Sequence, residues 1–173
     1  MARTALAWIR ATCLVCALAL VARADDVSVD DSDGHFTAVF PGPVQKSSQP
    51  AGASVLHIIN FDESDSVSYF VMWGDQPAGT WARVGGVEAA YKVAANRAMK
   101  SQGGTLRLEG ACSNFNTSGR EYIIDIPDKK LVCRVRYFIV GDRFYQDMYV
   151  GPPGTEFTPK TNAFLDSFRQ TLR

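Results

Sequence analysis

Residues with reactive side chains are scarce in this sequence. It contains two histidines, His35 and His57, and four cysteines among 173 residues. Neither histidine has a second metal ligand at a spacing such as HxxxH, which argues against a structural metal site. No serine stands in a GxSxG elbow, and no GxxxxGK loop is present to hold a phosphate. We therefore expect no metal, no cofactor and no catalytic motif.

A hydrolase-like enzyme with dispersed site residues remains the alternative, because the members of a catalytic triad need no fixed sequence order. Such an enzyme would bring His57 close to a carboxylate and a hydroxyl group in one pocket.

An excess of positive charge is also missing. The chain has 18 basic and 18 acidic residues, which gives a net charge of +0. Removal of Arg3, Arg10 and Arg23 with the N-terminal segment described next leaves 15 basic against 18 acidic residues. Nucleic acids and anionic lipids attract basic surfaces. A mildly acidic protein is a poor match for both, so we expect no nucleic-acid partner.

Residues 1–24 have the layout of a secretory signal peptide. Two arginines accompany an apolar run at 11–21, and Ala22-Arg23-Ala24 fits the small-x-small cleavage rule. We expect cleavage after Ala24 and a secreted or periplasmic mature protein without a transmembrane segment. The apolar run is shorter than the ~20 residues that span a bilayer. An uncleaved anchor and a lipid anchor at Cys16 are the alternatives.

Cys112 and Cys133 are the cysteines that remain after signal cleavage. An even pair in an oxidising compartment favours a disulfide. The expected strand register opposes it, since it places Cys133 opposite Ile124 or Asp125 and Cys112 near Arg120. That separation exceeds the ~7 Å between Cα atoms that a disulfide tolerates. A disulfide between Cys112 and Cys133 is therefore a prediction with an argument on each side.

Turn residues and hydrophobic periodicity divide the rest of the chain into a flexible acidic leader at 25–34 and a single domain at 35–173. Apolar residues spaced by three and four after Val87 predict a helix that ends at Gly103-Gly104, and Thr158 begins a second helix. The segment 44–53 has the composition of a loop. Alternating apolar residues predict strands at 35–41, 54–61, 67–73, 105–111, 120–126, 131–140 and 143–150.

The order βββ-α-ββββ-α is typical of an α+β domain, with a twisted antiparallel sheet of about six to seven strands and two packed helices. The first three strands are expected to form a meander. Apolar residues on one face of the last helix would cover the sheet, namely Phe164, Leu165, Phe168 and Leu172.

The pair Gly141-Asp142 predicts a tight type II′ hairpin that sets Val140 opposite Arg143 and Phe138 opposite Tyr145. On the strand after the turn, the side chains of Phe144, Gln146, Met148 and Val150 are expected toward the core. Those of Tyr145, Asp147 and Tyr149 are then expected on a half-exposed surface.

Aromatic residues are the candidates for a partner surface. Trp73 and Trp81 flank the loop at 74–80, and Phe157 lies in the connection before the last helix. Tyr145 and Tyr149 share the expected outer face of their strand. Loops and aromatic side chains often carry binding. The alternative is that these aromatics cap the edge of the core.

Three segments carry a resemblance to a known fold: FTAVFPGPV at 36–44, GDRFYQDMYVGPP at 141–153 and FLDSFR at 164–169. Together with the order of elements, they resemble the Mog1/PsbP-like α/β sandwich superfamily, among uncharacterised secreted bacterial proteins. The resemblance implies a partner-binding or assembly-assisting protein and transfers no catalytic residue. We therefore expect a non-enzymatic protein that binds another envelope or secreted protein.

Overall fold

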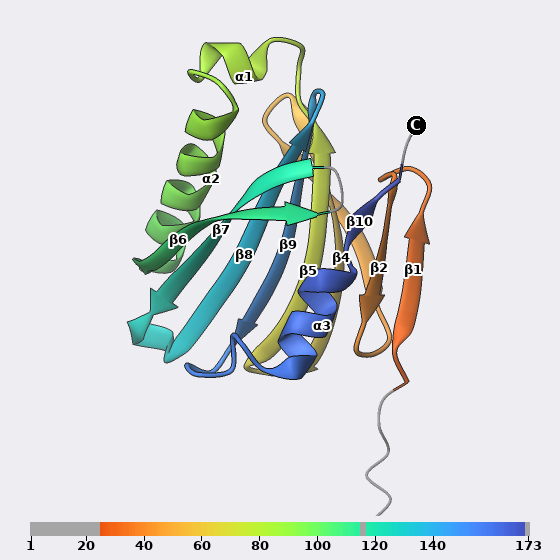
Figure 1. The fold of residues 1–173 in the computed structure, drawn as a ribbon, viewed down its shortest axis with the longest axis vertical. Helices are drawn as coiled ribbons and strands as arrows, with labels where there is room; N and C mark the ends of the chain where they lie inside the picture. The colour runs from red at the N-terminus through yellow and green to blue at the C-terminus, as the bar shows by residue number, and fades with distance from the viewer. Residues whose placement is uncertain (1–24, 115–116, 172–173) are drawn as a thin grey trace, which may run out of the picture.

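The computed structural model describes residues 25–114 and 117–171 (Figure 1). The expected signal peptide with its cleavage site and Leu172 of the expected last helix lie outside these ranges. Within them, no helix is long and apolar enough to cross a bilayer.

A seven-stranded antiparallel sheet forms the body of the protein, with the strand order β3-β4-β5-β9-β8-β7-β6. Its strands match the expected ones closely, except that β3 replaces an expected loop. Their bounds are β3 Gln45–Ala51, β4 Ser54–Ser64, β5 Val67–Asp75, β6 Thr105–Asn114, β7 Thr117–Ile126, β8 Leu131–Val140 and β9 Arg143–Gly151. Every residue of β3 is exposed. Backbone pairing with β4 holds this edge strand in place. Since none of its side chains is buried, its sequence has no hydrophobic pattern.

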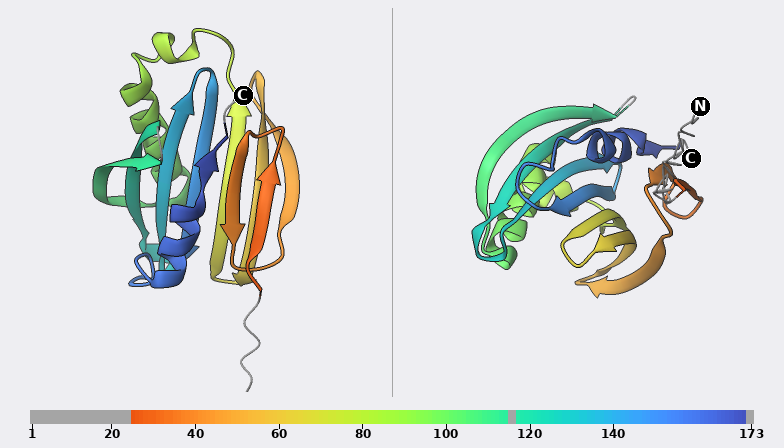
Figure 2. Two further views of the ribbon diagram at one scale, coloured as in Figure 1. Left: turned by 45° about the vertical axis from the view of Figure 1, so that its right-hand side comes forward. Right: turned by 90° about the horizontal axis from the view of Figure 1, so that it is seen from below.

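A second, three-stranded sheet with the order β1-β2-β10 stands beside the first (Figure 2). It consists of β1 Val27–Asp31, β2 Phe36–Phe40 and the short β10 Arg169–Gln170. The expected flexible leader at 25–34 is therefore wrong, because β1 pairs with β2 and buries Val29. The expected meander is also wrong, since β2 pairs with β1 and β10 and not with β4.

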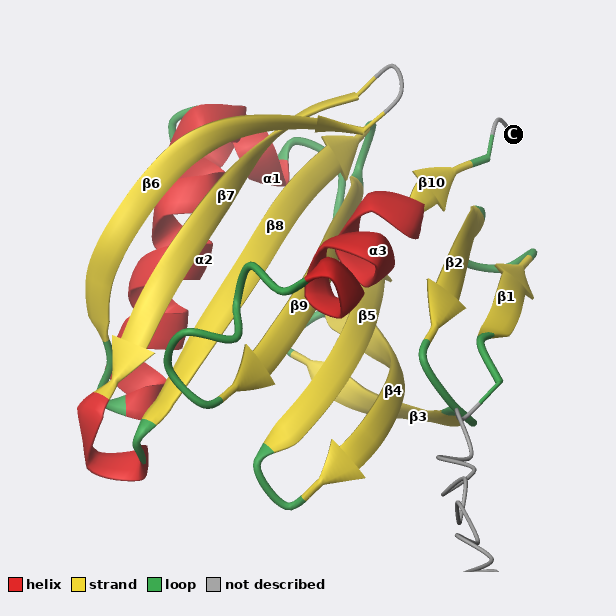
Figure 3. Ribbon diagram, turned by 60° about the horizontal axis from the view of Figure 1, so that its bottom comes forward, coloured by secondary structure: helices red, strands yellow, loops and turns green. Residues whose placement is uncertain are grey.

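The helices are α1 Thr80–Arg83, α2 Val87–Gln102, the 3-10 turn η1 Pro127–Lys129 and α3 Pro159–Ser167. Figure 3 shows α2 and α3 on opposite faces of the seven-stranded sheet. The αL residue Gly103, at φ 65°, ends α2 where the sequence predicted. The Thr158 side chain caps α3 by accepting from the Thr161 N–H at 3.3 Å. Because α3 ends at Ser167, Phe168 follows the helix, yet its ring is fully buried.

Each face of the large sheet has its own hydrophobic core. On the α3 face, aromatic rings from both sheets pack around Phe164 and Phe168. On the α2 face, Tyr91 and Ala95 of the helix pack against β7 and β8. The Tyr91 hydroxyl also accepts from the Ile139 N–H at 3.1 Å, which ties α2 to the sheet. The two faces below are called the α3 face and the α2 face.

The hairpin between β8 and β9 has the expected register, with Val140 opposite Arg143 and Phe138 opposite Tyr145. Gly141 has φ 61° in the turn, which a glycine adopts without strain. The expected direction of the two faces of β9 is wrong. Tyr145, Asp147 and Tyr149 are buried on the α3 face, whereas Phe144 and Met148 are only half-buried on the α2 face.

The predicted disulfide is absent, since Cys112 and Cys133 are both free thiols. Cys133 pairs with Ile124 and Cys112 with Gly119. Cys112 packs against the core of the α3 face, and Cys133 belongs to the core of the α2 face. The sheet itself separates the two sulfurs, so the strand register prevents a bridge between them.

Candidate functional site

A large concave feature lies on the α2 face of the large sheet. Helix α2 covers β7 and β8, and strands β9, β5 and β4 continue the sheet beyond it. The cavity between α2 and the β3–β5 part of the sheet has a volume of about 1170 Å³. We call this cavity the α2 groove.

Apolar side chains form the floor of the α2 groove. Phe70 and Met72 come from β5, Phe144 and Met148 from β9, and Leu56 from β4. All five are half-buried, so each still shows part of its apolar surface to solvent. Strand alternation explains the position of the first four, because their neighbours along β5 and β9 point into the core of the α3 face.

Small residues of α2 form one wall of the groove. Ala94 and Ala98 stand at a spacing of four, so they lie on the same side of the helix and both line the cavity. Gln146 interrupts the apolar floor, and exposed polar residues such as Gln102 and Ser66 line the edge of the cavity. An apolar centre with a polar rim is typical of ligand pockets and of protein interfaces.

The charges on the rim are unevenly distributed. Arg97 of α2 and Lys129 of η1 lie on one side, and Asp65 in the turn between β4 and β5 lies on the other. All three residues are exposed. Lys129 donates to Gln102 at 2.7 Å, which holds its ammonium group at the end of α2.

The groove is poorly equipped for acid–base or nucleophilic chemistry. Burial raises the pKa of the Cys133 thiol to about 12 and also raises the pKa of the Tyr137 hydroxyl, so both stay protonated at neutral pH. His57 is on the other face of β4, where its ring stacks on Trp73 at 3.9 Å. Within the described ranges, no three His, Cys, Asp or Glu side chains gather to hold a metal ion.

Three of the five aromatic candidates are part of the core. Trp73, Tyr145 and Tyr149 are 6%, 3% and 2% exposed, so they present no surface that a partner could contact. The alternative, that they belong to the core, is the one that holds for them. Arg143 covers the Trp73 ring at 4.4 Å and makes an ion pair with Asp75 at 2.7 Å, which closes this end of the core.

The other two candidates are accessible but lie at opposite ends of the sheet. Trp81 belongs to α1, and the connection between β9 and α3, which contains Phe157, lies at the other end of the strands (Figure 1). Phe157 is 53% exposed and lies under Arg134 at 4.8 Å. The Trp81 indole donates to the Gly141 carbonyl at 2.9 Å and packs against Phe144 at 6.3 Å. Trp81 therefore adjoins one end of the α2 groove.

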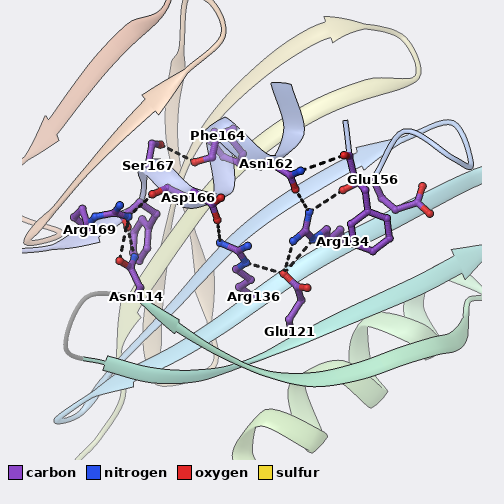
Figure 4. Close-up of polar contacts among 12 residues, drawn as sticks. Asn114, Glu121, Arg134, Arg136, Glu156, Asn162, Phe164, Asp166, Ser167 and Arg169 are labelled. Atoms are coloured by element: carbon purple, nitrogen blue, oxygen red, sulfur yellow. Dashed lines mark hydrogen bonds and ion pairs between the residues drawn. The ribbon is translucent and has the colours of Figure 1, made fainter. Parts of the chain in front are cut away.

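A polar cluster lies between α3 and the large sheet (Figure 4). Arg134 and Arg136 of β8 both donate to one oxygen of Glu121, at 3.0 and 2.7 Å. Arg136 also donates to Asp166 of α3 at 2.8 Å, and Arg134 to Asn162 at 2.6 Å. These contacts fasten α3 to the sheet, so we interpret this cluster as structural.

Asp147 lies in the same layer, opposite Arg136 in the sheet register. Its side chain is fully buried, and neither carboxylate oxygen has a hydrogen-bond partner among the described residues. Burial raises the pKa of Asp147 from its usual 3.8 to about 8, although the positive charge of Arg136 opposes the shift. The carboxyl group is therefore largely protonated at neutral pH.

Sequence analysis missed both sites. The groove residues Phe70, Met72 and Met148 have the same sequence pattern as core residues. The one signal for them was that the predicted sheet has more apolar surface than two helices can cover. Asp147 was expected at a half-exposed surface, because a carboxylate between two tyrosines normally marks a solvated face.

Comparisons with known proteins support the fold alone. No protein-family model and no curated protein matches the chain. A solved structure of cyanobacterial PsbP (CyanoP) from Synechocystis sp. PCC 6803 superposes with a TM-score of 0.62 at 10% identity, covering 87% of this chain and 95% of that one. A crystal structure from Bacteroides thetaiotaomicron VPI-5482 superposes with a TM-score of 0.37 at 6% identity, covering 80% of this chain and 46% of that one. The first superposition confirms the expected PsbP-like α+β fold.

Proposed function

We propose that this protein is a non-enzymatic binding or assembly-assisting protein of an extracytoplasmic compartment. Its partner is another secreted or envelope protein, which it binds in the α2 groove. The PsbP-like fold supports a binding or assembly role, and the signal-peptide features of residues 1–24 support export.

The observation that carries this proposal is the half-buried apolar floor of the groove. Met72, Phe144 and Met148 are among the large side chains that remain partly in contact with solvent there. Full burial of one such side chain contributes ~1.5–3 kcal/mol relative to exposure. A partner segment that covers several of them gains enough to offset part of the entropy lost on association.

Site-specific photo-crosslinking tests the proposal. A benzophenone amino acid replaces Gln146, which points into the groove, in the mature protein at 25–173. The labelled protein is irradiated in the envelope fraction of its own source. We expect a discrete crosslinked product that disappears when Met148→Glu is introduced into the same protein.

The control places the same photoreactive residue at Lys92, an exposed position of α2 that does not line the groove. If both positions give the same products, or if position 146 gives none, the proposed function is wrong.

A further inference from the structure

The α2 face of the large sheet has space for a second helix beside α2. An α-helix with its side chains is about 10–12 Å wide, and strands are about 4.8 Å apart, so one helix covers about two strands. Helix α2 packs on β7 and β8, and its neighbours β9, β5 and β4 form the floor of the groove. On the other face, α3 and the small sheet provide the matching layer. The α2 groove therefore has the position and the width that one more helix would need.

The side chains of the floor suit a helical partner. Met72 and Met148 stand on adjacent strands β5 and β9, next to Phe70 and Phe144. Methionine is flexible and polarizable, so it adapts to the irregular surface of a helix, as it does in other helix-binding grooves. Ala94 and Ala98 in the wall allow a second helix to approach α2 closely.

The rim charges define the polarity of this partner. Arg97 and Lys129 stand on the α2 side, and neither has an acidic ion-pair partner among the described side chains. Asp65 stands alone on the opposite side. A helix in the groove is therefore complementary when the flank that faces α2 is acidic.

We propose that the α2 groove binds an amphipathic α-helix of a partner protein, which lies beside α2. Its apolar stripe covers Met72 and Met148, and its acidic flank faces Arg97 and Lys129. This inference rests on the proposed binding function and adds the secondary structure and the charge of the bound segment.

Two designed peptides test the inference by fluorescence anisotropy. Each has about 18 residues, which gives a helix of ~27 Å, and carries leucines at a spacing of three and four together with a fluorescein label. One peptide has glutamates along one flank of the apolar stripe, and the other has lysines there. We expect the glutamate peptide to bind the mature protein more tightly than the lysine peptide, by about three- to tenfold.

Variants assign this binding to the groove. Met148→Glu places a charge on the floor and should weaken the glutamate peptide about a hundredfold. Arg97→Glu should abolish the preference between the two peptides, because the new carboxylate offsets the charge of Lys129. Lys92→Glu makes the same change of charge on an exposed part of α2 outside the groove, and it should leave the preference intact. Circular dichroism of each variant establishes that it is folded.

Two outcomes would overturn the helix proposal. In the first, the two peptides bind with equal affinity, or binding survives Met148→Glu. In the second, neither peptide binds, but 11-(dansylamino)undecanoic acid does, and Met148→Glu abolishes its binding. The second outcome assigns the groove to a single aliphatic chain and leaves a binding function in place. Absence of any groove-specific photo-crosslink, by contrast, removes the proposed function itself.

Discussion

Replacement of Asp147 by asparagine should change the pH dependence of stability in a defined direction. The folded protein holds the Asp147 proton up to about pH 8, whereas the usual pKa of the side chain is 3.8. Between these two pH values the folded state binds more protons than the unfolded state. The free energy of unfolding therefore falls as pH rises, by about 1.4 kcal/mol per pH unit.

The magnitude follows from the environment of the carboxyl group. It is fully buried without a hydrogen-bond partner among the described residues, so its ionised form is poorly solvated. Arg136 and Arg134 favour ionisation, but Glu121 opposes it and already accepts hydrogen bonds from both arginines. The contribution of the protonated Asp147 side chain to the free energy of unfolding is fully present below pH 3.8. It is lost as the pH rises toward 8. Across that window the loss is on the order of 5 kcal/mol.

Urea denaturation of the wild type and Asp147→Asn at several pH values between 5 and 8 measures this effect. The asparagine cannot ionise, so the variant should gain stability relative to the wild type as pH rises. The test depends on the slope of the difference, because the buried amide adds a penalty that does not change with pH. Asp142→Asn removes a carboxylate from the exposed turn before the same strand and serves as the control. Parallel pH profiles for the wild type and Asp147→Asn would refute the reasoning.

Three further predictions concern the core and the thiols. Phe168→Ala should lower the free energy of unfolding by about 3–5 kcal/mol, because its ring is fully buried between Phe36 and Phe138; an unchanged melting temperature would contradict this packing. Reductant should leave the melting temperature of the mature protein unchanged, and Cys112 and Cys133 should both react with a thiol reagent after unfolding without reductant; a titre below two thiols would indicate a bridge. Gly119→Ala should cost about 1–3 kcal/mol in a chemical denaturation series, because its new Cβ would lie 2.4 Å from the Tyr137 carbonyl oxygen; wild-type stability would show that β8 can yield there.

Local signals in the sequence were sufficient for the hairpin and for α2. Gly141-Asp142 sets the register of β8 and β9, since a tight turn leaves little freedom in how the strands pair. Helix α2 combines alanine-rich periodicity with a glycine that takes φ 65° at its end. In both cases the residues that determine the structure lie within a few positions of one another.

The missed strands depend on partners that are distant in the sequence. β3 is exposed along its whole length, and β1 has acidic residues around Val29, its one buried side chain. β3 has no apolar alternation, and the alternation in β1 is limited to Val27 and Val29. Their hydrogen bonds come from β4 and β2, so their structure appears only when the sheets assemble. Asp31 also stabilises the turn after β1 by accepting from the Gly34 N–H at 2.6 Å.

The reversed faces of β9 explain why the candidate site escaped sequence analysis. Both faces of this strand carry large side chains, so period two separates them but does not reveal which face is covered. Asp147 misleads, because its presence next to Tyr145 and Tyr149 favours a solvated face, yet all three are buried. The hydrophobic face with Phe144 and Met148 is the one that stays half-open, since α2 covers only part of the sheet. A sheet with seven strands, flanked by one long helix on that face, leaves apolar surface uncovered by geometry alone. That surplus is a property of the assembled sheet, so no local motif in the sequence reveals the α2 groove.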